Sequence, residues 1–292
     1  MTNLQEKKYW IWISYIKGLG IHRLNNLLKK YSSLDKIYKL KKEELVEIKG
    51  ISNNLAQNIT NINIKANINN VINYMQKNFI DIITIEDNDY PKILKQIYDP
   101  PICLYIKGKR DILNKRNIAM VGCRNSSEYG KKAAYYFSYN LSKSGFNIVS
   151  GLAKGVDSYS HIGTLAAKGS TIAVIGSGFD NIYPKENIEL ANKIILENGC
   201  ILTEYPIGTK PEKNNFPARN RIISGMSEAT IIVEAKKKSG TIITADFALE
   251  QGRDVFVVPG NINSPNSLGT NNLIKEGACP ITTYIDVLNE LK

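Results

Sequence analysis

The spacing of hydrophobic residues changes once along the chain, near residue 116. Before that point, apolar residues recur every three to four positions, as in YWIWISYIKGLGIHRLNNLLKKY, which is the pattern of amphipathic helices. After it, short buried runs alternate with amphipathic segments and glycine-containing turns. This alternation predicts an α/β fold: a parallel or mixed sheet with right-handed crossovers and helices on both faces, preceded by a small all-helical domain.

The same pattern divides the chain into three segments. They are 1–65, a helical domain that looks like a pair of helix-hairpin-helix units; 66–115, a connecting segment; and 116–292, the sheet domain. The helical domain has glycine turns at 17–20 and 49–52, which can offer N–H groups to a phosphate or simply cap helices in a bundle. In the connecting segment we expect a helix near 67–77 and an edge strand at 102–106.

Six buried strands are expected in the sheet domain, and a turn of small or charged residues follows most of them. The strands lie at 118–121, 146–149, 171–175, 200–203, 230–234 and 254–258. The carboxyl ends of parallel strands meet at one edge of a sheet, where the ligands of such folds bind. We therefore expect the functional residues in these turns, above all between residues 216 and 260.

Candidate anion-binding residues come from four junctions between strands and helices. They are Gly122 and Arg124; Ser150, Gly151 and Lys154; Arg219, Asn220 and Arg221; and Ser239, Gly240 and Thr241. Glycine lets a ligand approach the backbone, arginine offers parallel N–H donors, and a helix N-terminus attracts an anion. Two arginines at the start of a helix oppose its macrodipole, a conflict that a bound polyanion would relieve. The alternative is that these residues only shape and cap tight turns.

The net positive charge of the chain also favours a polyanion as partner, although the charge has a second explanation. The formal net charge is +11 and the isoelectric point is about 9.3, which favours a polyanion. The sequence is also crowded with Lys, Asn and Ile, so the lysine excess can equally reflect an AT-rich genome and a solvated surface. Arginine is more informative, because Arg124, Arg219, Arg221 and Arg253 lie in or beside turns.

Several classes of protein are disfavoured. No apolar run reaches the roughly 18 residues of a membrane span, and the first residues, MTNLQEKKYW, contain no signal-peptide core. The four cysteines are far apart and form no CxxC pair, so we expect no metal site, no disulfide framework and a cytoplasmic location. We also expect no cofactor, because GSGFDN at 176–181 lacks the third glycine of a dinucleotide fingerprint and no Walker pattern is present.

Catalytic residues are equally hard to assign. The two histidines are His22 and His161. Asp157 and His161 are four residues apart, but no nucleophile accompanies them at a known spacing. Glu204 and Glu234 follow strands, where they could act on a sugar, cap helices or pair with arginines. The sequence therefore indicates binding rather than catalysis.

Seven motifs occur in one order and together resemble one family. They are VGCRNSSEYG, SGLAKGVDSYSH, TIAVIGSGFDNIYP, TEYPIGTKP, FPARNRIISGMS, IIVEAKKKSGTIITA and GTNNLIKEGA. Over residues 90–278 the chain resembles the DNA-processing protein A (DprA/Smf) family, whose main domain is Rossmann-like, and 1–65 look like the sterile-alpha-motif-like domain of many members. Cys123 stands where the family usually has serine. Many members end in a winged-helix domain, which we do not expect here, because the chain stops at Lys292.

The resemblance implies a protein without enzymatic activity that binds and protects incoming single-stranded DNA. Such a protein helps to load the RecA recombinase during natural transformation and works as a homodimer. Carried over to this sequence, the DNA site would use Arg124, Lys185, Arg219, Asn220 and Arg221, together with the turn of Ser239, Gly240 and Thr241. Phe179 and Phe216 would stack on bases. Leu273 and Ile274 belong either to the dimer face or to the core.

Two other functions remain open from the sequence. Related Rossmann-like proteins cleave nucleotide monophosphates with a Pro-Gly-Gly-x-Gly-Thr turn and a nearby glutamate. Here Pro259 and Gly260 are followed by Asn261 and Ile262, so that turn is missing. The same phosphate pocket could instead serve a sensor of small nucleotides. Release of free base would favour the enzyme, and a calorimetric preference for nucleotides over oligonucleotides would favour the sensor.

Overall fold

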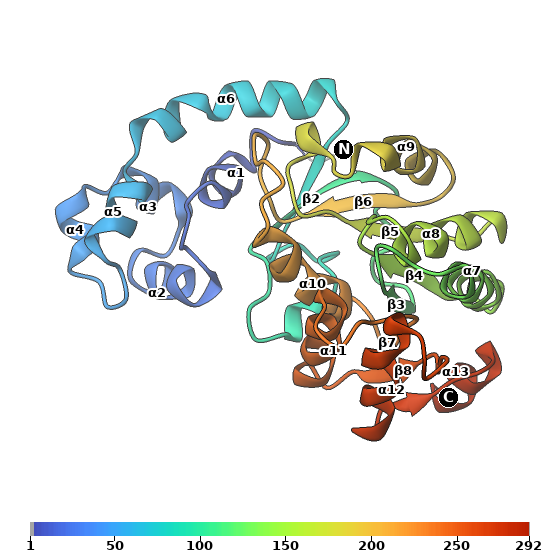
Figure 1. The fold of residues 1–292 in the computed structure, drawn as a ribbon. Coiled ribbons are helices and arrows are strands. Elements are labelled where there is room, and N and C mark those ends of the chain that lie inside the picture. Colours follow the sequence, from blue (N-terminus) through green and yellow to red (C-terminus); the bar gives the residue numbers. More distant parts are fainter. Residues whose placement is uncertain (1–2, 292) are drawn as a thin grey trace.

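A nine-stranded sheet forms the centre of the computed structural model, which describes residues 3–291 (Figure 1). The strands lie in the order β1-β2-β6-β5-β4-β3-β7-β8-β9. Their bounds are β1 Asp81–Thr84, β2 Cys103–Gly108, β3 Asn117–Val121, β4 Asn147–Ser150, β5 Thr171–Val174, β6 Cys200–Thr203, β7 Ala229–Ile232, β8 Asp254–Val257 and β9 Cys279–Pro280. β2 pairs antiparallel with β1 and β6, and the other pairs are parallel. The predicted α/β fold with a mixed, Rossmann-like sheet is confirmed.

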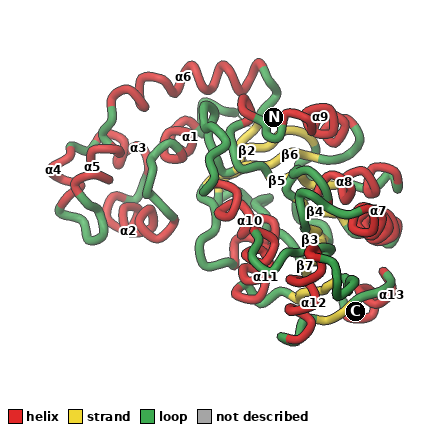
Figure 2. Tube along the Cα trace, in the orientation of Figure 1, coloured by secondary structure: helices red, strands yellow, loops and turns green. Residues whose placement is uncertain are grey.

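Helices cover both faces of the sheet (Figure 1 and Figure 2). Their bounds are α7 Glu128–Lys143, α8 Val156–Ala166, α9 Ile188–Leu196, α10 Asn215–Gly225, α11 Gly240–Glu250, α12 Leu268–Lys275 and α13 Tyr284–Glu290. In β3, Ile118 and Met120 pack in the core beneath α7 and α13, whereas Ala119 and Val121 pack in the core beneath α10 and α11. Successive side chains of a strand point to opposite faces, so each strand serves both cores. Within residues 3–291, no helix combines the length and apolar character needed to cross a bilayer.

The order of the strands reverses at β3. From β3 the chain moves outward through β4, β5 and β6, and it then returns to β7 on the other side of β3. The helices that follow β3 and β7, α7 and α11, consequently pack on opposite faces of the sheet. Such a switch point opens a crevice at the carboxyl ends of the strands, where ligands of doubly wound sheets bind.

Six helices precede the sheet, and most of them form an arm at one side of the molecule (Figure 1). Their bounds are α1 Lys8–Ser14, α2 Ile21–Tyr31, α3 Leu34–Lys39, α4 Lys42–Val46, α5 Asn53–Ile59 and α6 Ile62–Lys77. The long α6 leads from the arm back to the sheet, where β1 begins. Because α6 is continuous through residue 65, a boundary placed at that residue divides a helix.

The two predicted glycine turns of the arm have the same local structure. Leu19 N donates to Ile16 O at 3.2 Å, and the equivalent bond from Ile51 N is 3.0 Å long. Gly18 and Gly50 have φ of 85° and 89°, a left-handed conformation that glycine adopts without the strain a Cβ would cause. The second turn therefore reproduces the first, 32 residues later.

The strand predicted at the sheet edge lies inside the sheet. β2 covers most of the predicted range 102–106, and it is hydrogen-bonded to β1 on one side and to β6 on the other. Residues 103–106 are all buried, as expected of a strand that is covered on both faces of the sheet. The strand at this edge of the sheet is β1, which pairs with β2. The short apolar run of β1 does not reveal in the sequence which strand it pairs with. At the opposite edge, β9 contains only Cys279 and Pro280.

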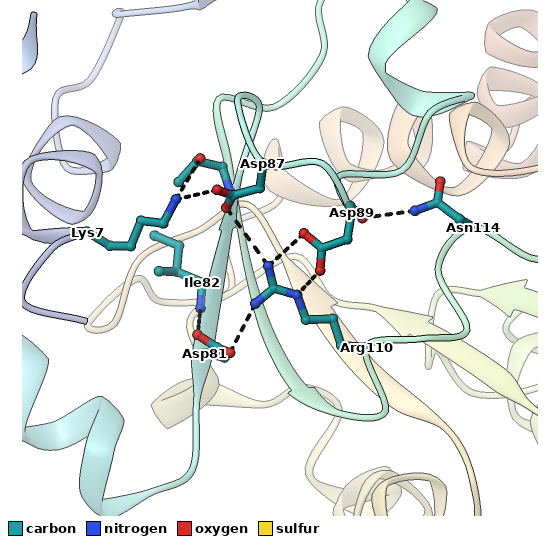
Figure 3. A network of polar contacts seen from close by, with 8 residues as sticks. Lys7, Asp81, Ile82, Asp87, Asp89, Arg110 and Asn114 are labelled. Carbon is teal, nitrogen blue, oxygen red and sulfur yellow. Dashed lines mark hydrogen bonds and ion pairs between the residues drawn. The ribbon is translucent and has the colours of Figure 1, made fainter. Parts of the chain in front are cut away.

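A network of charged side chains holds the segment at Lys7 against the β1 edge (Figure 3). Arg110 pairs with Asp81 at 3.1 Å and with Asp87 at 3.9 Å. It also pairs with Asp89, while Lys7 pairs with Asp87 from the other side. Burial alone would raise the pKa of Asp87, but hydrogen bonds from Lys7 and the backbone outweigh it, so the pKa lies below its ordinary value.

The lowered pKa of Asp87 makes part of the stability depend on pH. A carboxyl group whose pKa is lower in the folded chain than in the unfolded chain stabilises the fold at pH values above its pKa in the unfolded chain. This contribution is lost as the pH falls through its pKa in the folded chain. We expect Asp87→Asn to lower the free energy of unfolding at pH 7 and to approach the wild type below about pH 4. Urea unfolding at several pH values measures the difference in the free energy of unfolding between the wild type and the variant. Asp246→Asn, at an exposed position, is the control. A gap that widens on acidification would contradict the expected sign.

Candidate anion-binding site

A cavity of about 620 Å³ lies at the carboxyl ends of β3 and β7, where the strand order reverses. Of the predicted site residues, Gly122, Arg124, Phe216, Arg219, Asn220, Ser239, Gly240 and Thr241 line it. Gly151 and Lys154 line a smaller adjoining hollow of about 50 Å³. The turns after β3, β4 and β7 therefore meet the start of α10 around one cavity.

Two glycines allow the turn after β3 to pack on the turn after β4. Gly155 has φ of 76°, and a Cβ there would lie 2.3 Å from the carbonyl oxygen of Cys123. A Cβ at Gly122 would lie 2.6 Å from the side chain of Val156. Across this contact, Val156 N donates to Cys123 O at 3.3 Å. The close approach places the exposed Arg124 beside the cavity.

Two helix N-termini near the cavity are already neutralised by carboxylates of the chain. At α7, Glu234 accepts from Ser127 N at 3.0 Å and from Ser127 Oγ at 2.5 Å, in space that a side chain at Gly130 would fill. At α8, Asp157 lies in the first turn and accepts from Ala153 N at 3.3 Å. The sequence predicts a ligand anion at the start of α7, and the structure places Glu234 there instead.

The N-termini of α10 and α11 have no acidic residue in their first turns, and neither N-cap side chain makes a capping hydrogen bond. The N-cap of α11, Ser239, has a buried hydroxyl that finds no hydrogen-bonding partner within residues 3–291. Lys213 and Lys236 are exposed, precede α10 and α11, and line the cavity. Backbone N–H groups, a hydroxyl and two ammonium groups therefore surround a space that suits an anion.

One wall of the cavity combines a guanidinium group with two aromatic rings. Arg124 lies over Phe216 at 5.1 Å from the ring centroid, and the rings of Tyr183 and Phe216 are 5.7 Å apart. Gly176 leaves room for Phe216, since a Cβ there would lie 3.2 Å from that ring. Sequence reasoning missed Tyr183, which is 45% exposed, although an aromatic side chain in a turn was an available signal. Phe179 was the wrong choice for base stacking, because it is 8% exposed and packs in the core.

Arg219 does not take the predicted role of a phosphate contact, because the residue is only 4% exposed. Its guanidinium donates to Gly151 O at 2.6 Å and also to Val174 O, so it ties the end of β4 to the end of β5. Burial lowers the pKa of Arg219 to about 10, and the nearby carboxylate of Asp157 limits the fall. Burial raises the pKa of Asp157, and Arg219 opposes that rise. Arg219 therefore supports the cavity wall from inside.

Arg221 turns away from the cavity, although it lies only two residues beyond Arg219. It donates to the two carboxylate oxygens of Glu204 at 2.8 Å and 2.6 Å, and it lies 3.7 Å from Asp99. It lines a separate cavity of about 560 Å³ beside the start of α2. Residues two apart on an α-helix point in nearly opposite directions, so these two arginines cannot face one ligand. The prediction that Arg221 belongs to the same site is wrong.

The remaining predicted residues lie outside the cavity. Ser150 is buried and donates to Met120 O at 2.7 Å, so it stabilises the sheet. Lys185 is exposed on a short 3-10 turn and lies outside the lining of both hollows. Leu273 is buried in the core, and Ile274 is partly buried against it, which leaves Ile274 as the more accessible of the two.

His161 has no access to a ligand. The ring is fully buried, and Nδ1 lies 2.7 Å from Thr171 Oγ1. Burial, with a further contribution from Arg219, lowers the pKa of His161 to about 3, so the ring is neutral at physiological pH. Between residues 3 and 291, no group of three His, Cys, Asp or Glu side chains is placed to hold a metal ion. The cavity therefore has the chemistry of a binding site for anions and aromatic groups.

Comparison with known proteins relates the fold and the cavity to one family. The family model described as DNA recombination-mediator protein A matches residues 81–292. The DNA processing protein DprA of Bacillus subtilis (strain 168) is 47% identical over 213 residues, which cover 73% of this chain and 71% of that protein. Protein Smf of Synechocystis sp. is 39% identical over 290 residues, which cover 98% of this chain and 73% of that protein.

Two solved structures extend the similarity to three dimensions. The X-ray structure of DNA processing protein A from Streptococcus pneumoniae matches with a TM-score of 0.85 and 37% identity, covering 97% of each chain. A structure of DNA processing protein A from Helicobacter pylori, described for its unique single-stranded DNA binding mode, matches with a TM-score of 0.66 and 33% identity, covering 73% of this chain and 95% of that chain. The sheet and its switch point define a Rossmann-like protein, and the basic cavity is its candidate anion-binding site. The chain belongs to the DNA recombination-mediator protein A family, as its seven motifs predicted.

The burial of Arg219 predicts a structural defect when it is removed. Arg219→Ala leaves Asp157 buried without its counter-charge and two carbonyl oxygens without their donor, so we expect a loss of about 3–5 kcal/mol in the free energy of unfolding. Urea unfolding measures this loss. Arg23→Ala, an exposed arginine on α2, should change stability by less than about 1 kcal/mol. If Arg219→Ala were as stable as the wild type, the guanidinium would not hold the strand ends.

Proposed function

We propose that the cavity binds single-stranded DNA and that the protein acts as a recombination mediator without catalysing a reaction. The observation that carries this proposal is the combination of two helix N-termini lacking a carboxylate partner with the wall of Arg124, Phe216 and Tyr183. Helix N-termini attract phosphates, and aromatic rings offer surfaces on which exposed bases stack. Membership of the family supports the proposal, as does the single-stranded DNA binding mode described for the Helicobacter pylori relative.

The proposed path of a strand runs from the start of α11 to the aromatic wall. One phosphate would occupy the start of α11, where backbone N–H groups, the Ser239 hydroxyl and Lys236 can donate. Arg124 would contact a neighbouring phosphate while its other face rests on Phe216. A base would stack on Phe216 or Tyr183. None of these groups reads the edges of a base, so sequence preference should be weak.

The wider role belongs to the same proposal. It consists of protecting incoming single-stranded DNA and helping to load RecA in natural transformation, as a homodimer in the cytoplasm. Family membership supports this role. On α12, the exposed Leu268 and the partly buried Ile274 offer apolar area for contact between two copies. The division of the chain into 1–65, 66–115 and 116–292 is also proposed, with the end of α6 as a better first boundary than residue 65.

Two alternatives would use the same cavity and differ in ligand or product. A volume of about 620 Å³ accommodates a mononucleotide, which a nucleotide sensor would bind in preference to a longer strand. A nucleotide-cleaving enzyme would release free base. Calorimetry with a nucleoside monophosphate and with an oligothymidylate of about 20 nucleotides separates the sensor from the DNA-binding protein, and an assay for free base identifies the enzyme.

Arg124→Ala tests the phosphate contact. It removes a charge-assisted hydrogen bond, so we expect affinity for single-stranded DNA to fall about tenfold or more while the protein stays folded. The slope of log K against log salt concentration should become shallower by about one. Fluorescence anisotropy with a labelled oligothymidylate at several salt concentrations measures both, with Arg23→Ala as the matched control. The proposal fails if the wild type does not bind single-stranded DNA, or if its affinity does not depend on the salt concentration.

Gly240→Glu tests the α11 N-terminus separately from side-chain cations. A Cβ at Gly240 would meet no atom within 4 Å, so the side chain fits. A carboxylate in the first turn favours the helix macrodipole by about 0.3–1 kcal/mol, so stability should be equal or higher. The same charge repels a phosphate, and we expect an affinity loss of about tenfold by anisotropy. Gly240→Ala should bind as the wild type does. Undiminished binding by the stable Gly240→Glu protein would exclude this helix end from the site.

A further inference from the structure

The side of α7 that borders α8 carries a row of basic and aromatic side chains that the cavity does not use. Lys131, Tyr135, Tyr139 and Lys143 are spaced four residues apart, so they follow one another along one face of the helix. We call these four residues the tyrosine row. The face of α7 that packs on the sheet is formed by other residues, such as Phe137, which is buried. The row is therefore not needed to build the core.

The two rings of the tyrosine row are stacked at the surface. Their centroids are 6.0 Å apart, their planes differ by 15°, and Tyr135 is 38% exposed. Lys143 Nζ lies 5.9 Å from the Tyr139 centroid, and Lys131 Nζ lies 5.7 Å from the ring of Tyr159 on α8. Aromatic faces flanked by ammonium groups are the combination with which proteins hold single-stranded nucleic acid without reading its sequence.

The charges around the row favour a polyanion over a second copy of the chain. Exposed or partly exposed lysines on α7 and at the end of α8 are Lys131, Lys132, Lys143 and Lys168. The acidic residues of these two helices are Glu128, which pairs with Lys131 at 2.6 Å, and Asp157, which is buried. Two such surfaces facing one another would repel, whereas phosphates would be attracted.

We propose that the tyrosine row is a second contact for single-stranded nucleic acid, with bases stacked on Tyr135 and Tyr139 and phosphates paired with Lys143 and, in place of Glu128, with Lys131. This inference rests on the proposed function of the cavity. α7 begins at Glu128, directly after the turn that carries Arg124, so a strand leaving the cavity beside Arg124 reaches the row. At about 1.5 Å per residue the row is about 18 Å long, which is enough for several nucleotides of a single strand.

The length of the strand separates the two sites experimentally. Oligothymidylates of about 6 and about 20 nucleotides are titrated against the wild type and Tyr135→Ala/Tyr139→Ala. We expect the double variant to bind the short strand as the wild type does and the long strand at least about fivefold more weakly, the loss that stacking of one base contributes. Tyr135→Phe/Tyr139→Phe keeps the rings and should bind like the wild type. Tyr98→Ala, an exposed tyrosine outside α7, is the matched control.

A fluorescence readout distinguishes stacking from a structural effect. Trp10 and Trp12 are both buried, so Tyr139→Trp adds a partly exposed fluorophore to the row. Its emission should be quenched by the long strand and not by the short one. Equal affinity of the wild type and Tyr135→Ala/Tyr139→Ala for the long strand overturns the proposal. If the double variant binds the long strand as the wild type does but self-associates more weakly, the row is a contact between copies of the chain. If the wild type binds neither strand, the proposed function itself fails.

Discussion

A buried guanidinium holds together the part of the sheet on which the candidate site is built. Arg219 bonds to carbonyl oxygens at the ends of β4 and β5, and its Nε donates to Asn220 Oδ1 at 3.2 Å. The amide of Asn220 donates in turn to Gly240 O at 3.2 Å, at the start of α11. A continuous set of hydrogen bonds thus connects the interior of the sheet with the helix N-terminus that faces the cavity. The cost of burying this charge is offset by Asp157 and by the carbonyl dipoles.

The position of the candidate anion site follows from which helix N-termini already have a carboxylate of the chain beside them. Four helices begin near the switch point, and each N-terminus is a potential anion site. Glu234 occupies the first and Asp157 the second, both as parts of the folded chain. The other two, at α10 and α11, have lysines nearby and no carboxylate in their first turns. The two helix N-termini that could accept a phosphate therefore lie on one side of the crevice, next to the aromatic wall.

Local patterns predicted the fold and most of the cavity, because alternating apolar runs and the turns between them are local properties. The orientation of individual side chains was harder to predict. Arg219 and Arg221 were assigned together from their adjacency, although helical periodicity already separates them to opposite sides. Phe179 was assigned to base stacking and Tyr183 was overlooked, because burial within a turn cannot be read from composition. The contact of Glu234 with Ser127 joins residues 107 positions apart, and no local pattern contains it.

The edge strand β9 has a consequence for how the protein behaves at high concentration. Ile281 N donates inward to Val257 O at 2.9 Å, so the preceding residue, Pro280, presents its backbone to the outside of the sheet. Proline has no N–H group, and the outer side of this edge consequently lacks the donor that an added strand would need there. Sheets with open edges tend to recruit further strands and aggregate. Pro280 makes this end of a nine-stranded sheet a poor template for such growth.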